Sequence, residues 1–107
     1  FPIDLLNMTV TTTSSTITVS LTVINYGDSP VEATLIASAQ QTATKFMLKS
    51  VYLKITVNPG QTVTVSLTLT IPWTPAQGEY EVQGILATGL PHEGGFTLTH
   101  REQATTV

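Results

Sequence analysis

Apolar and hydroxyl-bearing residues alternate along much of the chain. The pattern is most regular over residues 62–71, TVTVSLTLTI, where every second residue is Val, Leu or Ile. Successive side chains of a β-strand point to opposite faces, so this period of two predicts a strand with one apolar face and one hydroxyl face. The same alternation over residues 6–10, 16–23 and 31–39 predicts three further strands, and the turn-forming sequence NYGDSP at 25–30 separates two of them.

The remaining segments are less regular. Residues 45–57, KFMLKSVYLKITV, fit either a helix or a strand, and the β-branched residues from Val51 onward favour a strand. Apolar residues alternate again over 80–86, and a short apolar pattern at Phe96 and Leu98 precedes a polar tail. The pattern therefore predicts about seven strands in a single domain, residues 1–107. We expect an all-β fold, an antiparallel β-sandwich of two packed sheets.

Three turn motifs carry a resemblance to a known group of domains. The motifs are Asn25-x-Gly27-Asp28, Pro59-Gly60-Gln61 and Gly78-x-Tyr80. Over residues 5–88 the chain resembles the immunoglobulin-like, adhesion-related (CARDB-like) modules of bacterial and archaeal surface proteins. The resemblance implies an immunoglobulin-like β-sandwich from a surface protein. Because these motifs shape turns, they specify a fold better than a function.

The composition of the chain disfavours nucleic acids and membranes as partners. Charged residues make up only 10% of the chain, against about 25% in ordinary soluble domains, so solubility must come from neutral groups such as the abundant Thr hydroxyls. With four basic residues and a net charge of -3, the chain lacks the basic footprint that nucleic acids require, and an anionic membrane surface is disfavoured. No apolar run reaches the roughly 18 residues of a spanning helix, so we expect no membrane insertion.

Two further features bear on compartment and processing. The chain contains no Cys, which excludes disulfides and metal sites built on thiolates. It begins at Phe1 rather than Met, which we interpret as a mature product after removal of a targeting segment, or as a trimmed chain.

Residues that could carry catalysis are few and scattered. His92 and Glu93, with His100 further on, are the best candidates for a metal or acid–base group. Their spacing does not place two ligands on one helical face, and catalytic zinc ordinarily takes three protein ligands. Ser residues lie on strand faces without the nucleophile-elbow pattern. We therefore expect no catalytic residue, no metal, no cofactor and no enzymatic activity.

The only Trp, Trp73, is a candidate ligand contact. It lies in a loop, where it either stacks against a sugar ring or folds over the end of the core, and we favour the second interpretation.

The sequence Asn-Met-Thr at 7–9 matches the acceptor pattern for N-glycosylation, which matters only in an exported protein. We expect Leu6, Met8 and Val10 to point inward, which would leave Asn7 facing solvent.

Residues 1–10 are a candidate donor strand. Edge strands expose unpaired backbone groups that soluble proteins usually guard with charges, and the long strands predicted here carry almost no Lys. An extended segment of one copy could therefore complete the sheet of a neighbouring copy. The side chains that would enter the neighbour are Ile3, Leu5, Leu6, Met8 and Val10. The alternative, which fits the periodicity equally well, is that residues 3–10 form the first strand of their own sheet.

Subunits of some archaeal and bacterial extracellular filaments are β-sandwiches that polymerise in this way, and the chain is similar to them in size, low charge and Thr richness. We therefore expect a structural subunit of an extracellular pilus-like or thread-like filament, or of a cell-surface assembly. Its partners would be copies of itself, with glycans as a further candidate. The alternative is an extracellular adhesion module that binds carbohydrate or a protein partner, with Trp73 at the site.

Overall fold

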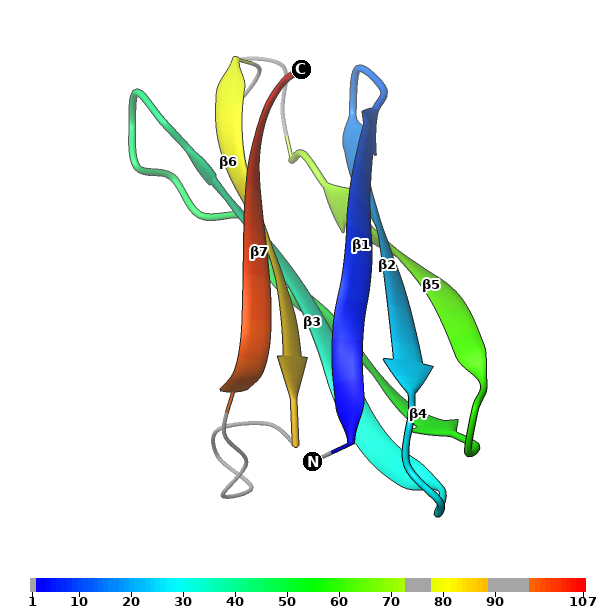
Figure 1. Ribbon diagram of the computed structural model, residues 1–107. Helices are drawn as coiled ribbons and strands as arrows, with labels where there is room; N and C mark the ends of the chain where they lie inside the picture. The colour runs from blue at the N-terminus through cyan, green and yellow to red at the C-terminus, as the bar shows by residue number, and fades with distance from the viewer. Residues whose placement is uncertain (1, 73–77, 89–96) are drawn as a thin grey trace.

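Seven β-strands form two antiparallel sheets that face each other (Figure 1). The computed structural model describes residues 2–72, 78–88 and 97–107. The strands are β1 (Ile3–Thr12), β2 (Thr16–Asn25), β3 (Val31–Gln41), β4 (Val51–Val57), β5 (Thr62–Thr70), β6 (Glu79–Ala87) and β7 (Thr97–Thr106). The strand orders are β1-β2-β5 in one sheet and β4-β3-β6-β7 in the other. The all-β fold expected from the period-two pattern, an antiparallel sandwich of two packed sheets, is confirmed.

The central strands set the register of each sheet. β2 lies between β1 and β5, with Met8 of β1 opposite Leu21. β3 lies between β4 and β6, and its Leu35 faces Leu53 on one side and Leu86 on the other. Paired residues of antiparallel strands share a face, so these pairs place apolar side chains of neighbouring strands together on the inner face.

The core lies between the sheets and uses the inward positions of the alternating pattern. The apolar side chains with no exposed surface are Ile17, Val19, Leu21, Val23, Leu35, Ala37, Val57, Leu69, Tyr80, Val82 and Leu86. Burial of one Val, Leu or Ile side chain is worth about 1.5–3 kcal/mol, so this layer is the main source of stability. At Gly84 the sheets approach closely, because a Cβ there would lie 2.6 Å from Leu21 Cδ2 and 2.8 Å from Met8 Sδ.

Asn25, the first residue of the Asn-x-Gly-Asp motif, joins two turns at one end of the sandwich. Its side chain is fully buried, donates hydrogen bonds to the carbonyl oxygens of Ser29 (2.8 Å) and Val57 (2.9 Å), and accepts one from the Gly27 amide (2.9 Å). Its backbone carbonyl accepts a bond of 2.7 Å from the amide of Gly60, whose φ of 74° is the left-handed conformation that glycine adopts most readily. The two turn motifs therefore form one hydrogen-bonded unit.

Two segments without a clear period-two pattern nevertheless form strands. The ambiguous segment 45–57 becomes strand β4 only from Val51, and Met47 before it makes an isolated bridge with Gln40. The expected polar tail is strand β7, which pairs along β6 up to Thr106 opposite Glu79. Its inner positions are polar, so the apolar alternation that reveals the other strands is absent.

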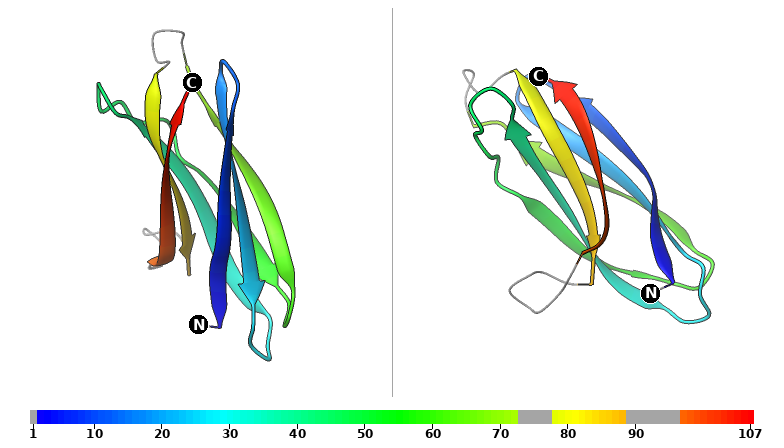
Figure 2. Two further views of the ribbon diagram at one scale, coloured as in Figure 1. Left: turned by 45° about the horizontal axis from the view of Figure 1, so that its top comes forward. Right: turned by 60° about the vertical axis from the view of Figure 1, so that its left-hand side comes forward.

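The two open flanks of the sandwich are formed by different pairs of edge strands. Figures 1 and 2 show β1 beside β7 on one flank and β4 beside β5 on the other, and residue contacts link both pairs. The molecule is elongated, 48 × 26 × 16 Å. Any partner that adds a strand would meet one of these flanks.

Candidate assembly surfaces

The candidate donor segment forms β1, the edge strand of the three-stranded sheet. Ile3, Leu5 and Met8 are buried, and Val10 is partly buried and packs against the core. All four contribute to the core of their own chain through pairing with β2. Whether the same strand also pairs with a neighbouring copy stays a prediction.

The fifth candidate, Leu6, was wrongly expected to point inward. Its side chain is 47% exposed, because the register of β1 against β2 shifts between Leu5 and Asn7. A bulge of this kind inserts one extra residue and reverses which side chains face the core. Ile3 and Leu5 therefore share the core face with Met8, and Asn7 is exposed as expected. Glycosylation of Asn7 stays a prediction.

Arg101 of β7 reaches across the flank to this bulge. Its Nη2 donates to the carbonyl oxygens of Leu5 and Leu6, each at 3.1 Å. Arg101 pairs with Gly84, so it lies on the inner face of its sheet, where a core residue would be expected. The contact of Arg101 with β1 was not predicted. The strand that carries Arg101 could have been predicted from the Thr-rich composition of residues 97–106, which favours a strand despite their polarity.

The outer face of β2 and β5 bears the hydroxyl groups that the period-two pattern predicted, and the pairing of the two strands arranges them as a ladder of hydroxyl pairs. Three pairs of side-chain oxygens lie within hydrogen-bonding distance: Thr18–Thr68 at 3.4 Å, Ser20–Ser66 at 2.9 Å and Thr22–Thr64 at 3.0 Å. Because each hydroxyl both donates and accepts, neighbouring strands satisfy one another without any charge. This face is polar and electrically neutral.

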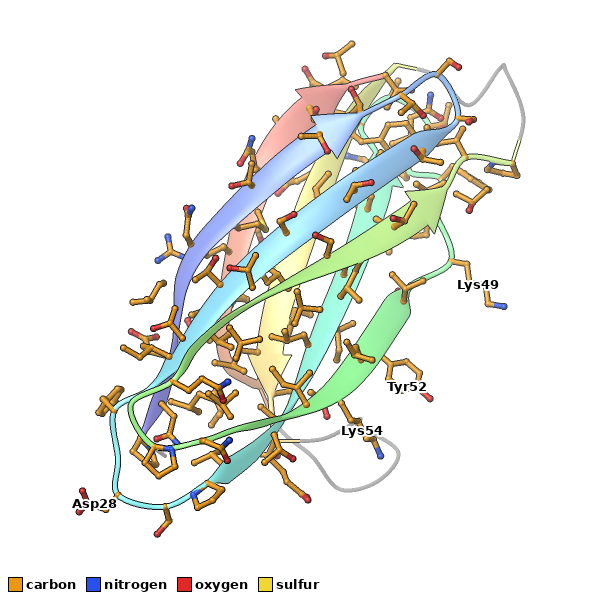
Figure 3. The ribbon with its side chains drawn as sticks, turned by 90° about the vertical axis from the view of Figure 1, so that its right-hand side faces the viewer. Asp28, Lys49, Tyr52 and Lys54 are labelled. Atoms are coloured by element: carbon orange, nitrogen blue, oxygen red, sulfur yellow. The ribbon has the colours of Figure 1, made fainter. Side chains whose placement is uncertain are left out.

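The flank between β4 and β5 exposes apolar side chains. Tyr52 is 54% exposed and Leu53 is 44% exposed. Val63 and Val65 of β5 are only partly buried. In Figure 3 the labelled side chains of Tyr52 and Lys54 on β4, and of Lys49 just before this strand, project outward. The apolar interior is therefore less fully covered here than at the centre of the sandwich.

An acidic group lies on the outer face of β6 and β7. The side-chain hydrogen bond with Glu102, and secondly repulsion from that carboxylate, raise the pKa of Glu81, while Lys45 acts in the opposite direction. His100 Nε2 lies 4.0 Å from the nearer Glu102 oxygen. Beside the two carboxyl groups is an open hollow of about 170 Å³ that reaches β3 and Met47.

The remaining candidate residues of the sequence lie mostly outside the part of the chain that the structure describes. Trp73 and the HEGG segment at 92–95 are outside the described residues. Within the described residues, no group of three His, Asp or Glu side chains could hold a metal ion. None of the described residues belongs to a helix long and apolar enough to span a membrane.

Neither a known protein family nor a curated protein matches the chain. Solved structures do match, at low sequence identity. A putative β-galactosidase from Bacteroides fragilis has a TM-score of 0.63 at 20% identity, over 99% of this chain and 16% of that one. β-Glucosidase 3B from Thermotoga neapolitana, in complex with α-D-glucose, has a TM-score of 0.59 at 15% identity, over 98% of this chain and 17% of that one.

A β-glucosidase from Kluyveromyces marxianus has a TM-score of 0.60 at 18% identity, over 98% of this chain and 14% of that one. The chain thus corresponds to less than a fifth of each of these proteins. At such identities the likeness shows the fold alone. The chain is an immunoglobulin-like β-sandwich.

Proposed function

We propose that the protein is a non-enzymatic structural subunit outside the cell, and that copies of it assemble by strand addition with β1 as the donor. The observation that carries this proposal is the dual position of β1. The side chains of Ile3, Leu5 and Met8 lie in the core, yet β1 is an edge strand joined to β2 by a turn at residues 13–15.

Exchange of β1 between copies would preserve its contacts. The same inner side chains would pack against β2 of a neighbour. The equilibrium between monomer and exchanged assembly therefore depends on the stability of the turn and on the entropy of association. The turn is closed by a bond of 2.9 Å from the Thr13 amide to the Thr16 carbonyl, and the two hydroxyls of these residues lie 2.7 Å apart. Opening this turn would release β1 toward a neighbouring molecule.

The surface supports the same proposal. The hydroxyl ladder of β2 and β5 is neutral, so this face does not repel a copy of itself. The exposed Asn7 acceptor sequence fits an exported protein. A low charge and a large hydroxyl surface together favour close packing of identical subunits.

Removal of residues 1–12 tests the donor role. The shortened chain should lose assembly, measured by sedimentation velocity and electron microscopy, and should bind a synthetic peptide of residues 1–12. A peptide with Leu5→Asp should fail to bind, because Leu5 is buried, whereas a matched peptide with Leu6→Asp should bind, because Leu6 is exposed. A shortened chain that stays folded and assembles like the parent would exclude β1 as donor.

A second candidate function is that of an accessory module in a larger carbohydrate-acting protein. It is favoured by the matches to a β-galactosidase and to β-glucosidases, in which the chain corresponds to one segment. Trp73 would then contact a sugar. Retention on an insoluble β-glucan that is lost in Trp73→Ala, with assembly unchanged, would support this candidate over the filament subunit.

A further inference from the structure

The four-stranded sheet ends in two edges of different character. In the order β4-β3-β6-β7, the outer strands are β4 and β7. Within the described parts of the chain, each of them pairs with one neighbour only, β4 with β3 and β7 with β6. Each therefore presents a row of backbone N–H and C=O groups toward the outside of the sheet.

The direction of the two edge strands makes them suited to each other. Every step across this sheet is antiparallel, from β4 to β3, to β6 and to β7. Three reversals leave β4 and β7 antiparallel. A second copy, moved sideways and turned to follow the twist of the sheet, would thus bring its β4 antiparallel to β7 of the first and continue the sheet with the same face inward.

On their outer faces the two edge strands carry side chains of opposite charge. Lys54 pairs with Thr34 and points to the outer face of β4, and Lys49 lies just before this strand. Glu102 pairs with Gln83 and points to the outer face of β7. An antiparallel register with Lys54 opposite Glu102 keeps both side chains on the outer face.

Glu102 also belongs to a group of carboxyl groups that repel one another. Glu81 and Glu102 share a hydrogen bond and repel each other when both are ionised, with Glu79 adding to the repulsion and Lys45 reducing it. His100 is 4.0 Å from Glu102 and is charged only when protonated. A cation from a second molecule would relieve this repulsion.

The apolar exposure of the two flanks is complementary as well. The sideways displacement that joins β4 to β7 also brings the β1 flank of one copy toward the β5 flank of the other. Leu6 is exposed on the first flank, and Leu53, an inward position of β4, is exposed on the second. Contact between the flanks would remove these side chains from water.

From these relationships we infer that β4 of one copy pairs with β7 of a second copy, head to tail, and extends the four-stranded sheet from molecule to molecule. The inference rests on the proposed assembly of copies and names a contact whose backbone pairing joins β4 to β7 rather than using β1 as a donor. Because the two surfaces differ, the interface is heterologous and repeats without closing.

Charge reversal at the two edges tests the pairing. Glu102→Lys and Lys54→Glu should each weaken assembly at low salt by about tenfold or more in apparent Kd, because like charges would then face each other. An equimolar mixture of the two variants should assemble like the parent, since each then offers a complementary edge. The double variant should also assemble by itself.

Controls separate this contact from folding and from net charge. Asp28→Lys makes the same change in charge as Glu102→Lys, in the turn between β2 and β3 (Figure 3), and should leave assembly unchanged. Because Lys54 has contacts within its own chain, Lys49→Glu is a second variant of the basic edge. Thermal melts of all variants report folding.

The outcomes are distinct. If the parent assembles and the reversals at both edges leave its apparent Kd unchanged, or if mixing the variants restores nothing, the β4–β7 pairing is wrong while assembly by another surface stands. If the parent stays monomeric at all concentrations up to the solubility limit, the proposed function fails and the pairing fails with it.

Discussion

The side-chain amide of Asn25 donates a hydrogen bond of 2.9 Å to the carbonyl oxygen of Val57, and so ties the end of β2 in one sheet to the end of β4 in the other. The same amide bonds the Ser29 carbonyl, and the side-chain oxygen accepts from Gly27. A buried polar group that loses its partner costs about 1–3 kcal/mol. This one side chain satisfies three backbone groups at once.

Replacement of Asn25 should therefore be strongly destabilising. We expect Asn25→Leu to lower the free energy of unfolding by about 2–4 kcal/mol, because the three backbone groups lose their partner. Urea denaturation measures this loss. Asn58→Ala, at an exposed Asn of the neighbouring turn, is the matched control and should stay within about 0.5 kcal/mol of the parent. An equal effect of both substitutions would contradict the role of Asn25.

The close approach of the two sheets at Gly84 should make a larger residue at this position destabilising. An added methyl group in Gly84→Ala would meet the side-chain ends of Leu21 and Met8, which must shift. Overpacking of this kind costs about 1–3 kcal/mol. Hydrogen exchange should show the largest loss of protection in β1, which carries Met8. In the variant Gly84→Ala with Met8→Ala, the smaller neighbour should recover part of the loss. Additive losses in this double variant would argue against the contact.

The bulge in β1 predicts opposite outcomes at adjacent Leu residues. Leu5→Asp should lower the free energy of unfolding by about 3 kcal/mol or more, because an uncompensated charge would be buried. Leu6→Asp should change it by no more than about 0.5 kcal/mol, because this side chain is exposed. Chemical denaturation of the two variants compares them directly. Similar destabilisation by both would mean that the register shift is misplaced.

The acidic group predicts a dependence of stability on pH. The pKa of Glu81 is raised above its ordinary value of 4.5, first by the hydrogen bond with Glu102 and then by repulsion. A carboxyl group with a raised pKa binds its proton more tightly in the folded state. Its contribution to stability is therefore fully present below the ordinary pKa and is lost as pH rises through the raised one.

Glu102→Gln should consequently raise the melting temperature near neutral pH, where it removes a repelling charge. The advantage should shrink on acidification, because Glu81 of the parent takes up its proton as pH falls through its raised pKa. Melts between pH 3 and pH 8 test this, with Glu32→Gln on β3 as a matched control. A constant difference across the whole range would show that the two carboxyl groups do not interact.

The sequence predicted the fold better than the site because the two depend on different signals. Alternation at residues 62–71 reports directly which side chains face the core, and β5 follows it. The bulge at Leu6 leaves the composition of β1 unchanged and alters only which of its side chains face the core. The periodicity alone therefore placed Leu6 on the wrong face. β7 lacked the signal altogether, since its inner residues include Arg101 instead of an aliphatic side chain.

The contacts between distant segments were also beyond the sequence pattern. The motif around Asn25 indicated a turn, but its bond to Val57 depends on how the two sheets are stacked. The proximity of Glu81 and Glu102 likewise follows from the register of β6 against β7. Such relationships emerge only when the strands have been paired.

The hydroxyl ladder has a consequence for how the protein responds to its medium. β2 and β5 contain no ionisable side chain, and the hydrogen bonds across their outer face join neutral oxygens. Neither acid nor salt alters the charge state of these groups. The acidic group that titrates lies on the opposite sheet, with β6 and β7. The outer face of β2 and β5 thus stays electrostatically constant while the outer face of β6 and β7 adjusts to its surroundings.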